Sequence, residues 1–415
     1  MMLPSKKALE KIYEDADSAV FRFKKLSENF KKAFNSEQME FFTSPGRAEI
    51  IGNHTDHNGG KVIAGSISLD TIGAAFPSQD DTIQIISERF DEVVKFKISE
   101  IDKVPKRHGS LSLVAGMVKS IKDLGYKVNG FNLFTSSTVI AGAGLSSSAS
   151  FEMLVCSVIN YFFNENTLDI IQCAKIGQKA ENEYWCKASG LMDQVACSVG
   201  GAIKLDFNGD VKYEKINLDF DKLNYSIIIV NTGKGHADLS SEYSSIPFEM
   251  KSVAKKLGYD LLCETSLEEL VKKTPELIKL LKNDRALLRA YHFYNENQRV
   301  EEMGKLLESE TANIKEIIKL IDESGRSSFE FLQNCYVDSQ PNEQKISLCL
   351  ALSLQFIKKI GKGVCRVHGG GFAGAIMTIL PKEAVSDYVK FMERFVGKEN
   401  VYLMNIRKTG TVHIS

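Results

Sequence analysis

The 415-residue sequence predicts a protein that combines helices and strands in two or three domains. Three observations support this fold class. Stretches rich in β-branched residues, typical of strands, lie between residues 60 and 97. Roughly a hundred residues of mostly helical pattern end near residue 362, and the tail then returns to mixed strand and helix. A shift in composition between residues 207 and 223 predicts a domain boundary there.

The first elements follow from spacing and turn residues. Residues 5–34 place apolar side chains at helical spacing among Lys and Glu, which predicts a helix. The segment EFFTSPGRAEII (40–51) predicts a short strand closed by a turn, because Ser-Pro-Gly is typical of turns. Hairpin strands are predicted next, in the stretches KVIAGSISLDTIGAAF, TIQIIS and EVVKFKI. A helix over residues 110–126, with Gly125 as its C-cap, comes next.

The middle of the chain predicts a strand, a glycine turn and two helices. FNLFTSSTVI (131–140) is typical of a strand, and residues 145–163 predict an apolar helix with a serine-rich first turn. The next helix covers residues 167–185 and is capped by Asn166 or Thr167. Beyond the helical region, GVCRVHGGGFAGAIMTIL predicts strand, glycine turn and strand, followed by one more helix and a final strand.

Bulk composition excludes several classes of function. The 52 Lys and Arg balance the 53 Asp and Glu, so no net field favours nucleic acid or an anionic membrane as a partner. The amino terminus lacks the apolar core of a signal peptide, and no segment is long enough to span a bilayer, so a cytoplasmic location is expected. The eight cysteines never form C-x-x-C and are interpreted as reduced thiols.

A glycine-rich stretch, AGAGLSSSAS (141–150), leads directly into the serine-rich helix. Glycines let the backbone approach a phosphate, and the helix start offers unpaired N–H groups and hydroxyls for phosphate or Mg²⁺. The stretch is not a Walker A sequence, because no Gly-Lys-Ser/Thr follows. A serine-capped helix after a flexible turn is the alternative interpretation.

Three further features carry candidate chemistry. Asp193, in KASGLMDQVACSVGG, is an acid within a small apolar run, where it can accept a proton from a substrate hydroxyl or simply cap a helix. Glu181 lies on a predicted helix, and a carboxylate beside Ser147 suits Mg²⁺; a solvated glutamate is the alternative. HGGGFAGA (368–375) is a second glycine turn, suited to a ligand or to tight packing alone.

Four stretches follow one another along the chain: PGRAEIIGNHTDHNGG (45–60), GAGLSSSAS, GLMDQ and HGGGFAGA. Together they resemble the three motifs of the GHMP small-molecule kinases, and the first stretch resembles the signature of galactokinases. The resemblance covers nearly the whole chain. It implies a two-domain α+β fold: an N-terminal half like domain 2 of ribosomal protein S5 (1–210) and a ferredoxin-like C-terminal half (211–415) with the third motif. It also implies an active site in the cleft between them.

The resemblance further implies roles for particular residues. Asp193 faces the attacking sugar hydroxyl, where it either abstracts the proton or only orients the group, and Arg47 lies beside it. Ser147 and Glu181 hold Mg²⁺. The residues that embrace the ATP phosphates are Gly142, Ala143, Gly144, Leu145, Ser146, Ser147 and Ser148. Those that form the sugar pocket are Asn53, His54, Asp56, Gly190 and Tyr243.

The chain departs from the commonest pattern of that signature at several positions. The family usually has Asn where this chain has Glu49, Glu where it has Asn53, and Tyr where it has His57. An amide in place of a carboxylate adds donors and loses a charge, so contacts to the sugar are expected to be rearranged. The proline that commonly opens the phosphate motif is Ile140 here.

The implied activity is an ATP-dependent sugar 1-kinase that converts α-D-galactose into galactose 1-phosphate, with ATP and Mg²⁺ as cofactors and a monomer or weak homo-oligomer as the assembly. Kinases for N-acetylgalactosamine, L-arabinose or, more distantly, mevalonate are alternatives. A regulator that binds ATP and galactose without efficient turnover is an alternative of another class. The intact Arg47, triple serine and Asp193 favour catalysis.

Overall fold

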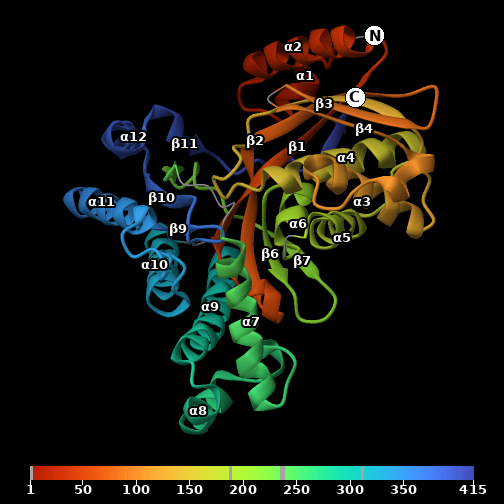
Figure 1. The fold of residues 1–415 in the computed structure, drawn as a ribbon. Helices are drawn as coiled ribbons and strands as arrows, with labels where there is room; N and C mark the ends of the chain where they lie inside the picture. Colours follow the sequence, from red (N-terminus) through yellow and green to blue (C-terminus); the bar gives the residue numbers. More distant parts are fainter. Residues whose placement is uncertain (1–2, 89, 187–188, 234–238, 310–312) are drawn as a thin grey trace.

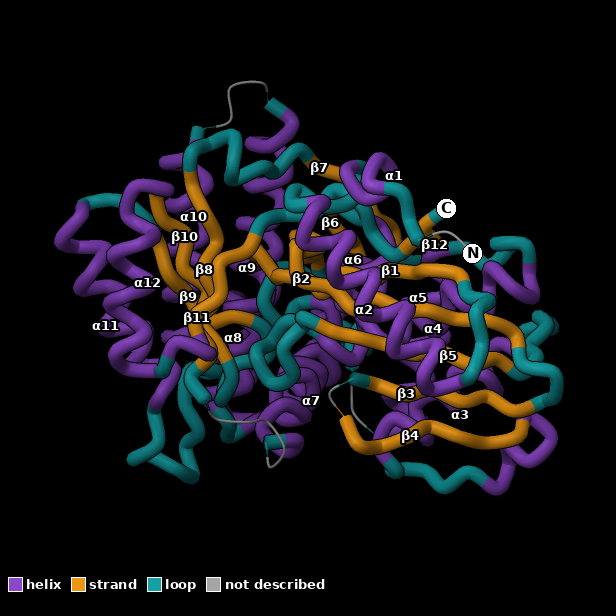
Figure 2. The backbone as a smooth tube through the Cα atoms, turned by 90° about the horizontal axis from the view of Figure 1, so that it is seen from above, coloured by secondary structure: helices purple, strands orange, loops and turns teal. Residues whose placement is uncertain are grey.

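The protein is described by a computed structural model that covers residues 3–88, 90–186, 189–233, 239–309 and 313–415. Its strands form two sheets, and helices pack on both of them (Figure 1). The predicted mixed fold class is therefore confirmed. Figure 2 shows the larger sheet and the smaller sheet side by side, each with its own helices. The structure therefore divides the strands between two layers that lie next to one another.

The larger sheet has the order β12-β1-β2-β5-β3-β4, and β6 and β7 extend it from β2. All its neighbouring strands are antiparallel except the parallel pair β3 and β5. Its strands are β1 (Glu40–Ile51), β2 (Lys61–Pro77), β3 (Thr82–Ser87), β4 (Phe90–Lys97), β5 (Phe131–Ser137), β6 (Ala202–Asp206), β7 (Lys212–Ile216) and β12 (Val412–Ile414).

Helices cover both faces of this sheet because neighbouring strand residues point to opposite sides. Phe41 packs with α2 (Ala16–Phe34), whereas Phe42 packs in a second core with α3 (Gly109–Asp123) and α4 (Ser147–Asn164). The helices α5 (Ile170–Ala180) and α6 (Met192–Val199) pack on the side of α3 and α4. A short α1 (Lys6–Glu10) precedes α2.

The smaller sheet has the order β11-β8-β10-β9 and is antiparallel throughout. Its strands are β8 (Tyr225–Asn231), β9 (Val364–His368), β10 (Ala375–Pro381) and β11 (Val401–Met404). Ile227 and Ile229 face a core shared with helices α9 (Asp284–Glu308) and α10 (Ile314–Ser327). Ile228 and Val230 face α11 (Lys345–Ile360) and α12 (Lys382–Val396). Both faces of this sheet are therefore buried.

The predicted helical region is confirmed in the part of the chain between β8 and β9. The helices of this half are α7 (Ser240–Leu257), α8 (Leu267–Leu281), α9 (Asp284–Glu308), α10 (Ile314–Ser327), α11 (Lys345–Ile360) and α12 (Lys382–Val396). Figure 1 shows α7, α8 and the start of α9 extending away from the rest of the molecule. The long α9 returns from this extension and contacts β1 and β2.

Three sequence-based expectations about elements are wrong in detail. The helix expected over residues 5–34 is broken into α1 and α2, because Asp15 caps a new helix by accepting a hydrogen bond from the backbone of Ser18. The turn expected at Ser-Pro-Gly is absent, and β1 runs through Pro45 with a register shift against β2. The cap of α5 is Asp169, in a capping box with Gln172, rather than Asn166 or Thr167.

The two sheets do not divide at one point of the chain. The strand β7 pairs with β6 although it lies beyond residue 210, and β12, at the carboxyl end, pairs with β1. The last strand, β12, therefore forms an edge of the sheet of the first half. The division into two domains, 1–210 and 211–415, stays a prediction.

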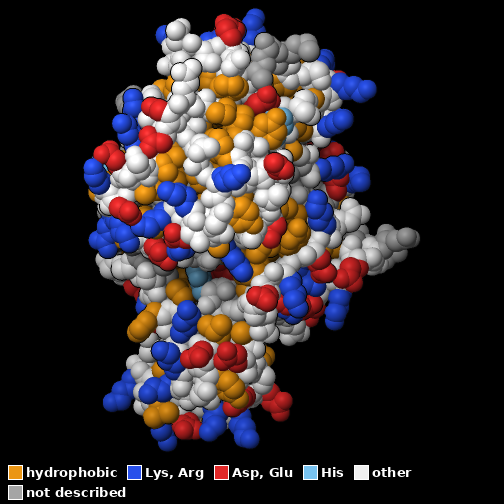
Figure 3. Space-filling model, turned by 90° about the vertical axis from the view of Figure 1, so that its right-hand side faces the viewer, with side chains coloured by type: hydrophobic (Ala, Val, Ile, Leu, Met, Phe, Trp, Pro, Cys, Tyr) orange, Lys and Arg blue, Asp and Glu red, His pale blue; other side chains and the backbone are white. Residues whose placement is uncertain are grey.

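The surface carries both signs of charge. On the face drawn in Figure 3, basic and acidic side chains are interspersed, in keeping with the formal net charge of −1. Among the described residues, no helix combines the length and the apolar character needed to cross a bilayer.

Candidate active site

An ion pair between two segments far apart in the sequence marks the candidate active site. Arg47 lies on β1, and Asp193 lies in the first turn of α6. The Arg47 Nε and Nη2 atoms donate to the two carboxylate oxygens of Asp193 at 2.7 and 2.9 Å. The structure thus brings together the two residues that the sequence predicts to be catalytic, in the bidentate geometry that is the strongest for this pair of groups.

The two partners of this pair differ in exposure. The Arg47 side chain is 7% exposed and that of Asp193 is 26% exposed, so the carboxylate is the side of the pair that a substrate can reach. Burial alone lowers the pKa of Arg47, but the contact with Asp193 outweighs it and the pKa lies above its usual value. The guanidinium is therefore a fixed positive charge, and it favours the carboxylate form of its partner.

The predicted phosphate loop lies against this pair. Arg47 donates through Nη1 to the carbonyl oxygen of Gly144, and its backbone N–H donates to Leu145 at 3.2 Å. The hydroxyl of Ser146 donates to Asp193. Gly142, Gly144 and Ser146 all adopt positive φ angles just before α4 begins. These contacts hold the start of α4, with its unpaired backbone N–H groups, beside the Arg47–Asp193 pair.

The third motif, HGGGFAGA (368–375), approaches the same loop. A Cβ atom at Gly144 would lie 3.2 Å from the Nδ1 atom of His368 and 3.3 Å from its carbonyl oxygen, so the backbone passes too closely for a comfortable side chain. Three glycine-containing motifs from the amino end, the middle and the carboxyl end of the chain therefore meet at one place.

The predicted magnesium ligands are Ser147, at the start of α4, and Glu181, after α5. Glu181 is only 2% exposed and begins a π-helical turn after α5, and it accepts a hydrogen bond from the hydroxyl of Ser148 at 2.8 Å. Ser147 is the first residue of α4. A buried carboxylate beside a serine hydroxyl fits the ligand preference of Mg²⁺, which also takes phosphate oxygens. The assignments of Ser147 and Glu181 as magnesium ligands both stay predictions, and the hydrogen bond described for Glu181 is with Ser148.

Asp56 and Gly190, both predicted to contact sugar, touch one another. Asp56 begins the short helix η1 (Asp56–Asn58) after β1, and its Oδ1 atom accepts a hydrogen bond from the backbone of His57 at 3.0 Å. A Cβ atom at Gly190 would lie only 1.7 Å from the Oδ2 atom of Asp56. Position 190 therefore requires glycine, because any side chain would displace the Asp56 carboxylate.

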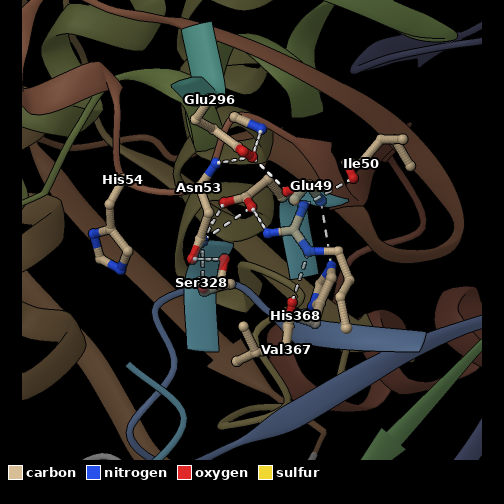
Figure 4. A network of polar contacts seen from close by, with 12 residues as sticks. Glu49, Ile50, Asn53, His54, Glu296, Ser328, Val367 and His368 are labelled. Carbon is tan, nitrogen blue, oxygen red and sulfur yellow. Dashed lines mark hydrogen bonds and ion pairs between the residues drawn. The ribbon is translucent and has the colours of Figure 1, made fainter. Parts of the chain in front are cut away.

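Asn53, also predicted to contact sugar, is 1% exposed and both ends of its amide bind the protein. Its Nδ2 atom donates to the two oxygens of Glu49 at 3.0 and 3.2 Å and to the carbonyl of Gly369 at 2.8 Å. Its Oδ1 atom accepts from Asn334 at 2.8 Å. Figure 4 shows this network, in which the amide points toward the third motif. Direct contact of Asn53 with sugar stays a prediction.

Two positions where the chain departs from the family signature, Glu49 and Asn53, contact one another. The family usually has an amide at the first position and a carboxylate at the second; this chain has the reverse, and its two side chains form a carboxylate–amide hydrogen bond. Glu49 also pairs with Arg366 at 3.0 Å, and Arg366 donates to the carbonyl of Ile50 at 2.9 Å. Burial raises the pKa of Glu49, and Arg366 partly offsets this effect.

His54 and Tyr243 reach the glycine turn of the third motif. The Nε2 atom of His54 lies 2.9 Å from the carbonyl of Gly370 and is therefore the protonated nitrogen. Burial lowers the pKa of His54 to about 3, so the ring is neutral near pH 7. The hydroxyl of Tyr243 donates to Gly371 at 2.8 Å. The predicted sugar residues thus come from the signature segment, from the residues just before α6 and from α7.

Some residues at the site escape sequence reasoning. His368 is buried, its Nε2 atom accepts a hydrogen bond from the backbone of Glu49 at 3.2 Å, and burial lowers its pKa well below the usual value. Its position as the first residue of HGGGFAGA was the available signal. His292 and Glu296 on α9 contact the backbone of the signature segment, and no motif in the sequence marks them.

Two family models match this chain. The galactokinase galactose-binding signature matches residues 28–77, and the N-terminal domain of the GHMP kinases matches residues 112–201. The first range contains Arg47 and the segment with Asp56, and the second contains the phosphate loop, Glu181 and Asp193. The two ranges together contain both members of the ion pair at the candidate site.

Several curated galactokinases are similar over most of their length. The galactokinase of Clostridium tetani is 34% identical over 373 residues, which cover 88% of this chain and 90% of the relative. That of Lactococcus lactis (strain IL1403) is 33% identical over 380 residues, with 88% and 89% covered.

Solved structures agree with these relatives. The crystal structure of Lactococcus lactis galactokinase complexed with galactose is 27% identical and superposes with a TM-score of 0.80, covering 94% of this chain and 99% of the other. The mevalonate kinase of Methanococcus jannaschii, at 17% identity and a TM-score of 0.60 over 89% and 98%, shares the fold alone. With its signature, its phosphate loop and its third motif meeting at one ion pair, the chain belongs to the galactokinase family of the GHMP kinases.

Proposed function

We propose that this protein transfers the γ-phosphoryl group of ATP to the anomeric hydroxyl of α-D-galactose, giving galactose 1-phosphate and ADP. One observation carries the proposal: Asp193 contacts Arg47 and Ser146 of the phosphate loop, and Gly190, three residues before Asp193, lies against Asp56. The relative from Lactococcus lactis, which was crystallised with galactose, supports galactose as the sugar.

In the proposed reaction the anomeric oxygen attacks the γ-phosphorus. A new oxygen–phosphorus bond forms, the bond from the γ-phosphorus to the bridging oxygen breaks, and ADP leaves with that electron pair. Asp193 accepts the hydrogen bond of the attacking hydroxyl, and its carboxylate takes the proton as the new bond forms. Because phosphoryl transfer is largely loose, orientation of the hydroxyl by Asp193 contributes to the rate besides its basicity.

The positive and hydrogen-bonding groups around Asp193 stabilise the transferring group. Arg47 is a fixed positive charge beside the attacking oxygen, and the N-terminal turn of α4 supplies backbone N–H groups to the phosphates. Mg²⁺, held in this proposal by Ser147 and Glu181, supplies charge neutralisation of the phosphates when it is bound.

Asp56 is the proposed residue of sugar selectivity. One carboxylate can accept hydrogen bonds from two neighbouring hydroxyls, and a site of this kind strongly rejects a sugar whose hydroxyl points elsewhere. Gly190 leaves room for the Asp56 carboxylate. The proposal also includes a cytoplasmic location, where ATP is available, and a monomer or weak homo-oligomer as the active form.

Coupled detection of ADP release over a panel of acceptors tests the proposal. Purified protein with Mg²⁺ and ATP is expected to turn over galactose at a kcat/KM well above those for glucose, N-acetylgalactosamine, L-arabinose and mevalonate. A higher kcat/KM for another acceptor would replace galactose by that substrate. Binding of galactose and ATP without ADP release would instead favour a regulator.

A further inference from the structure

The backbone of the signature segment is held by one face of α9. The carboxylate of Glu296 accepts hydrogen bonds from the backbone N–H groups of Gly52 and Asn53 at 2.9 and 3.3 Å. The ring of His292, one helical turn earlier, contacts the carbonyl oxygen of Asn53 through Nε2 at 2.8 Å. Figure 4 shows Glu296 pointing at this backbone from the side opposite to His368.

The protonation of His292 follows from its partners. A carbonyl oxygen only accepts, so Nε2 carries the proton, and Nδ1 accepts from the hydroxyl of Ser327 at 2.8 Å. Burial lowers the pKa of His292, so the ring stays neutral near pH 7. Each nitrogen of the ring therefore has one fixed role, and the Asn53 carbonyl is held by a single donor on α9.

Glu296 is fully buried but remains a carboxylate. Burial raises its pKa, but the charges of Arg299 and Arg366 and the hydrogen bond from Ser324 outweigh this effect and hold the pKa well below its usual range. Arg299 pairs with it at 2.7 Å, and the hydroxyl of Ser324 donates to it. A buried charge of this kind keeps a fixed geometry, because any movement leaves it without partners.

The same helix also holds the other end of the segment. The Oδ1 atom of Asn297 accepts a hydrogen bond from the backbone N–H of Lys61, the first residue of β2, at 2.7 Å. Asp56 lies between the two anchored ends, at residues 52–53 and at residue 61. Because α9 binds both ends of this segment, the position of the Asp56 carboxylate depends on α9. This helix belongs to the carboxyl-terminal half and carries none of the family motifs.

We propose that Glu296 and His292 are positioning residues for sugar recognition: they set the backbone of residues 52–54 and thereby the place of Asp56, so their loss weakens galactose binding while ATP binding is retained. This inference rests on the proposed function for the identity of the sugar. A role in packing the two halves alone would affect both substrates equally.

Three variants on α9 test the inference. Glu296→Gln keeps the volume but replaces one acceptor oxygen by a donor, so one partner is left unpaired. His292→Phe keeps a planar ring and removes both nitrogens, whereas His292→Gln keeps an amide N–H near the place of Nε2. The matched control is Glu249→Gln, which removes another buried carboxylate, paired with Arg289 of α9 at 2.8 Å.

Steady-state kinetics and calorimetric titration with galactose and ATP give the readout. Glu296→Gln and His292→Phe are expected to raise the KM and the Kd for galactose about tenfold to hundredfold, because a buried group loses its partner, while the values for ATP stay within about threefold. His292→Gln and Glu249→Gln are expected to keep the galactose values within about threefold of those of the unaltered protein.

Other outcomes overturn the inference. These are an equal rise in the galactose and ATP constants, the same loss in His292→Phe and His292→Gln, or a split between the two substrates in Glu249→Gln. If the unaltered protein binds galactose but releases no ADP, the proposed function fails. In that case the calorimetric galactose affinities of the variants still decide the inference about α9.

Discussion

Arg47 and Asp193 are 146 residues apart in the sequence, yet each contributes two atoms to one planar contact. Arg47 also binds the backbone of the phosphate loop, so one side chain fixes the acid and the loop relative to each other. In the proposed reaction such a prearranged charge stabilises the transferring phosphoryl group without rearrangement. The proposal therefore requires these two residue types together.

Replacement of Asp193 by Asn tests the role of the acid. The amide keeps the size of the side chain but can neither take a proton nor pair with Arg47 in the same way, so kcat is expected to fall about 10²- to 10⁴-fold. The Kd for ATP is expected to change little, because the N-terminal turn of α4 binds the phosphates. Single-turnover kinetics and ATP titration give the two values. Unchanged turnover would remove Asp193 from the mechanism.

A double-mutant cycle on Glu49 and Asn53 tests the exchanged pair. Asn53→Glu alone places two buried carboxylates side by side and is expected to cost about 3–5 kcal/mol of unfolding free energy. The double variant, Glu49→Asn with Asn53→Glu, restores a carboxylate–amide pair, so a favourable coupling energy of about 1–3 kcal/mol is expected. Urea unfolding of the four proteins measures it. Additive effects would show that the two side chains act independently.

At the scale of elements, Asp70 on β2 joins three segments of the chain. Its buried carboxylate pairs with Arg22 of α2 at 2.7 Å and with Arg407, which follows β11, at 2.9 Å. The hydroxyl of Tyr13, between α1 and α2, donates to it at 2.6 Å. Burial raises the pKa of Asp70, but the two arginines and the hydroxyls outweigh it, and the pKa is lowered.

Asp70→Asn is expected to lower the free energy of unfolding by about 3–5 kcal/mol at pH 7, because two arginines lose their buried partner. The pKa of Asp70 is lower in the folded state than in the unfolded state. Its stabilisation is therefore present above the unfolded pKa, about 3.9, and is lost as the pH falls through the folded value. Urea unfolding between pH 7 and pH 3 is expected to show a smaller decline for the variant. Equal slopes would exclude Asp70 as a source of acid sensitivity.

The helices and strands were largely predictable from the sequence because their signals are local. The helical stretch before residue 362 and the strands between residues 60 and 97 follow from periodicity. Element ends were harder to predict. Asp169 caps α5 although Asn166 and Thr167 are also good caps, and Pro45 lies inside β1 because a register shift accommodates it.

At the scale of the whole molecule, the two sheets are joined at the signature segment. Arg366 and His368 on β9 bind the backbone of β1 at Ile50 and Glu49, and the core beneath contains residues from both sheets. Residues of the site from both halves are therefore held in one place.

The motif residues of the candidate site were predictable from the sequence. The residues from the second half that hydrogen-bond to the signature segment were not. Arg47, Asp193 and the serine-rich helix start were identified because their motifs are contiguous in the sequence. His292, Glu296 and Asn334 reach the site only through the return of the chain from the second half. Contacts over such separations leave no local pattern, so only the structure reveals them.

The structure of the reaction product tests the central claim most directly. Phosphorus and proton nuclear magnetic resonance of the reaction with galactose, Mg²⁺ and ATP identifies the oxygen that receives the phosphate. The proposed reaction predicts one sugar phosphate, with phosphorus coupled to the anomeric proton of the α-anomer. Phosphate on any other hydroxyl of galactose, or ADP formed without a sugar phosphate, would contradict it.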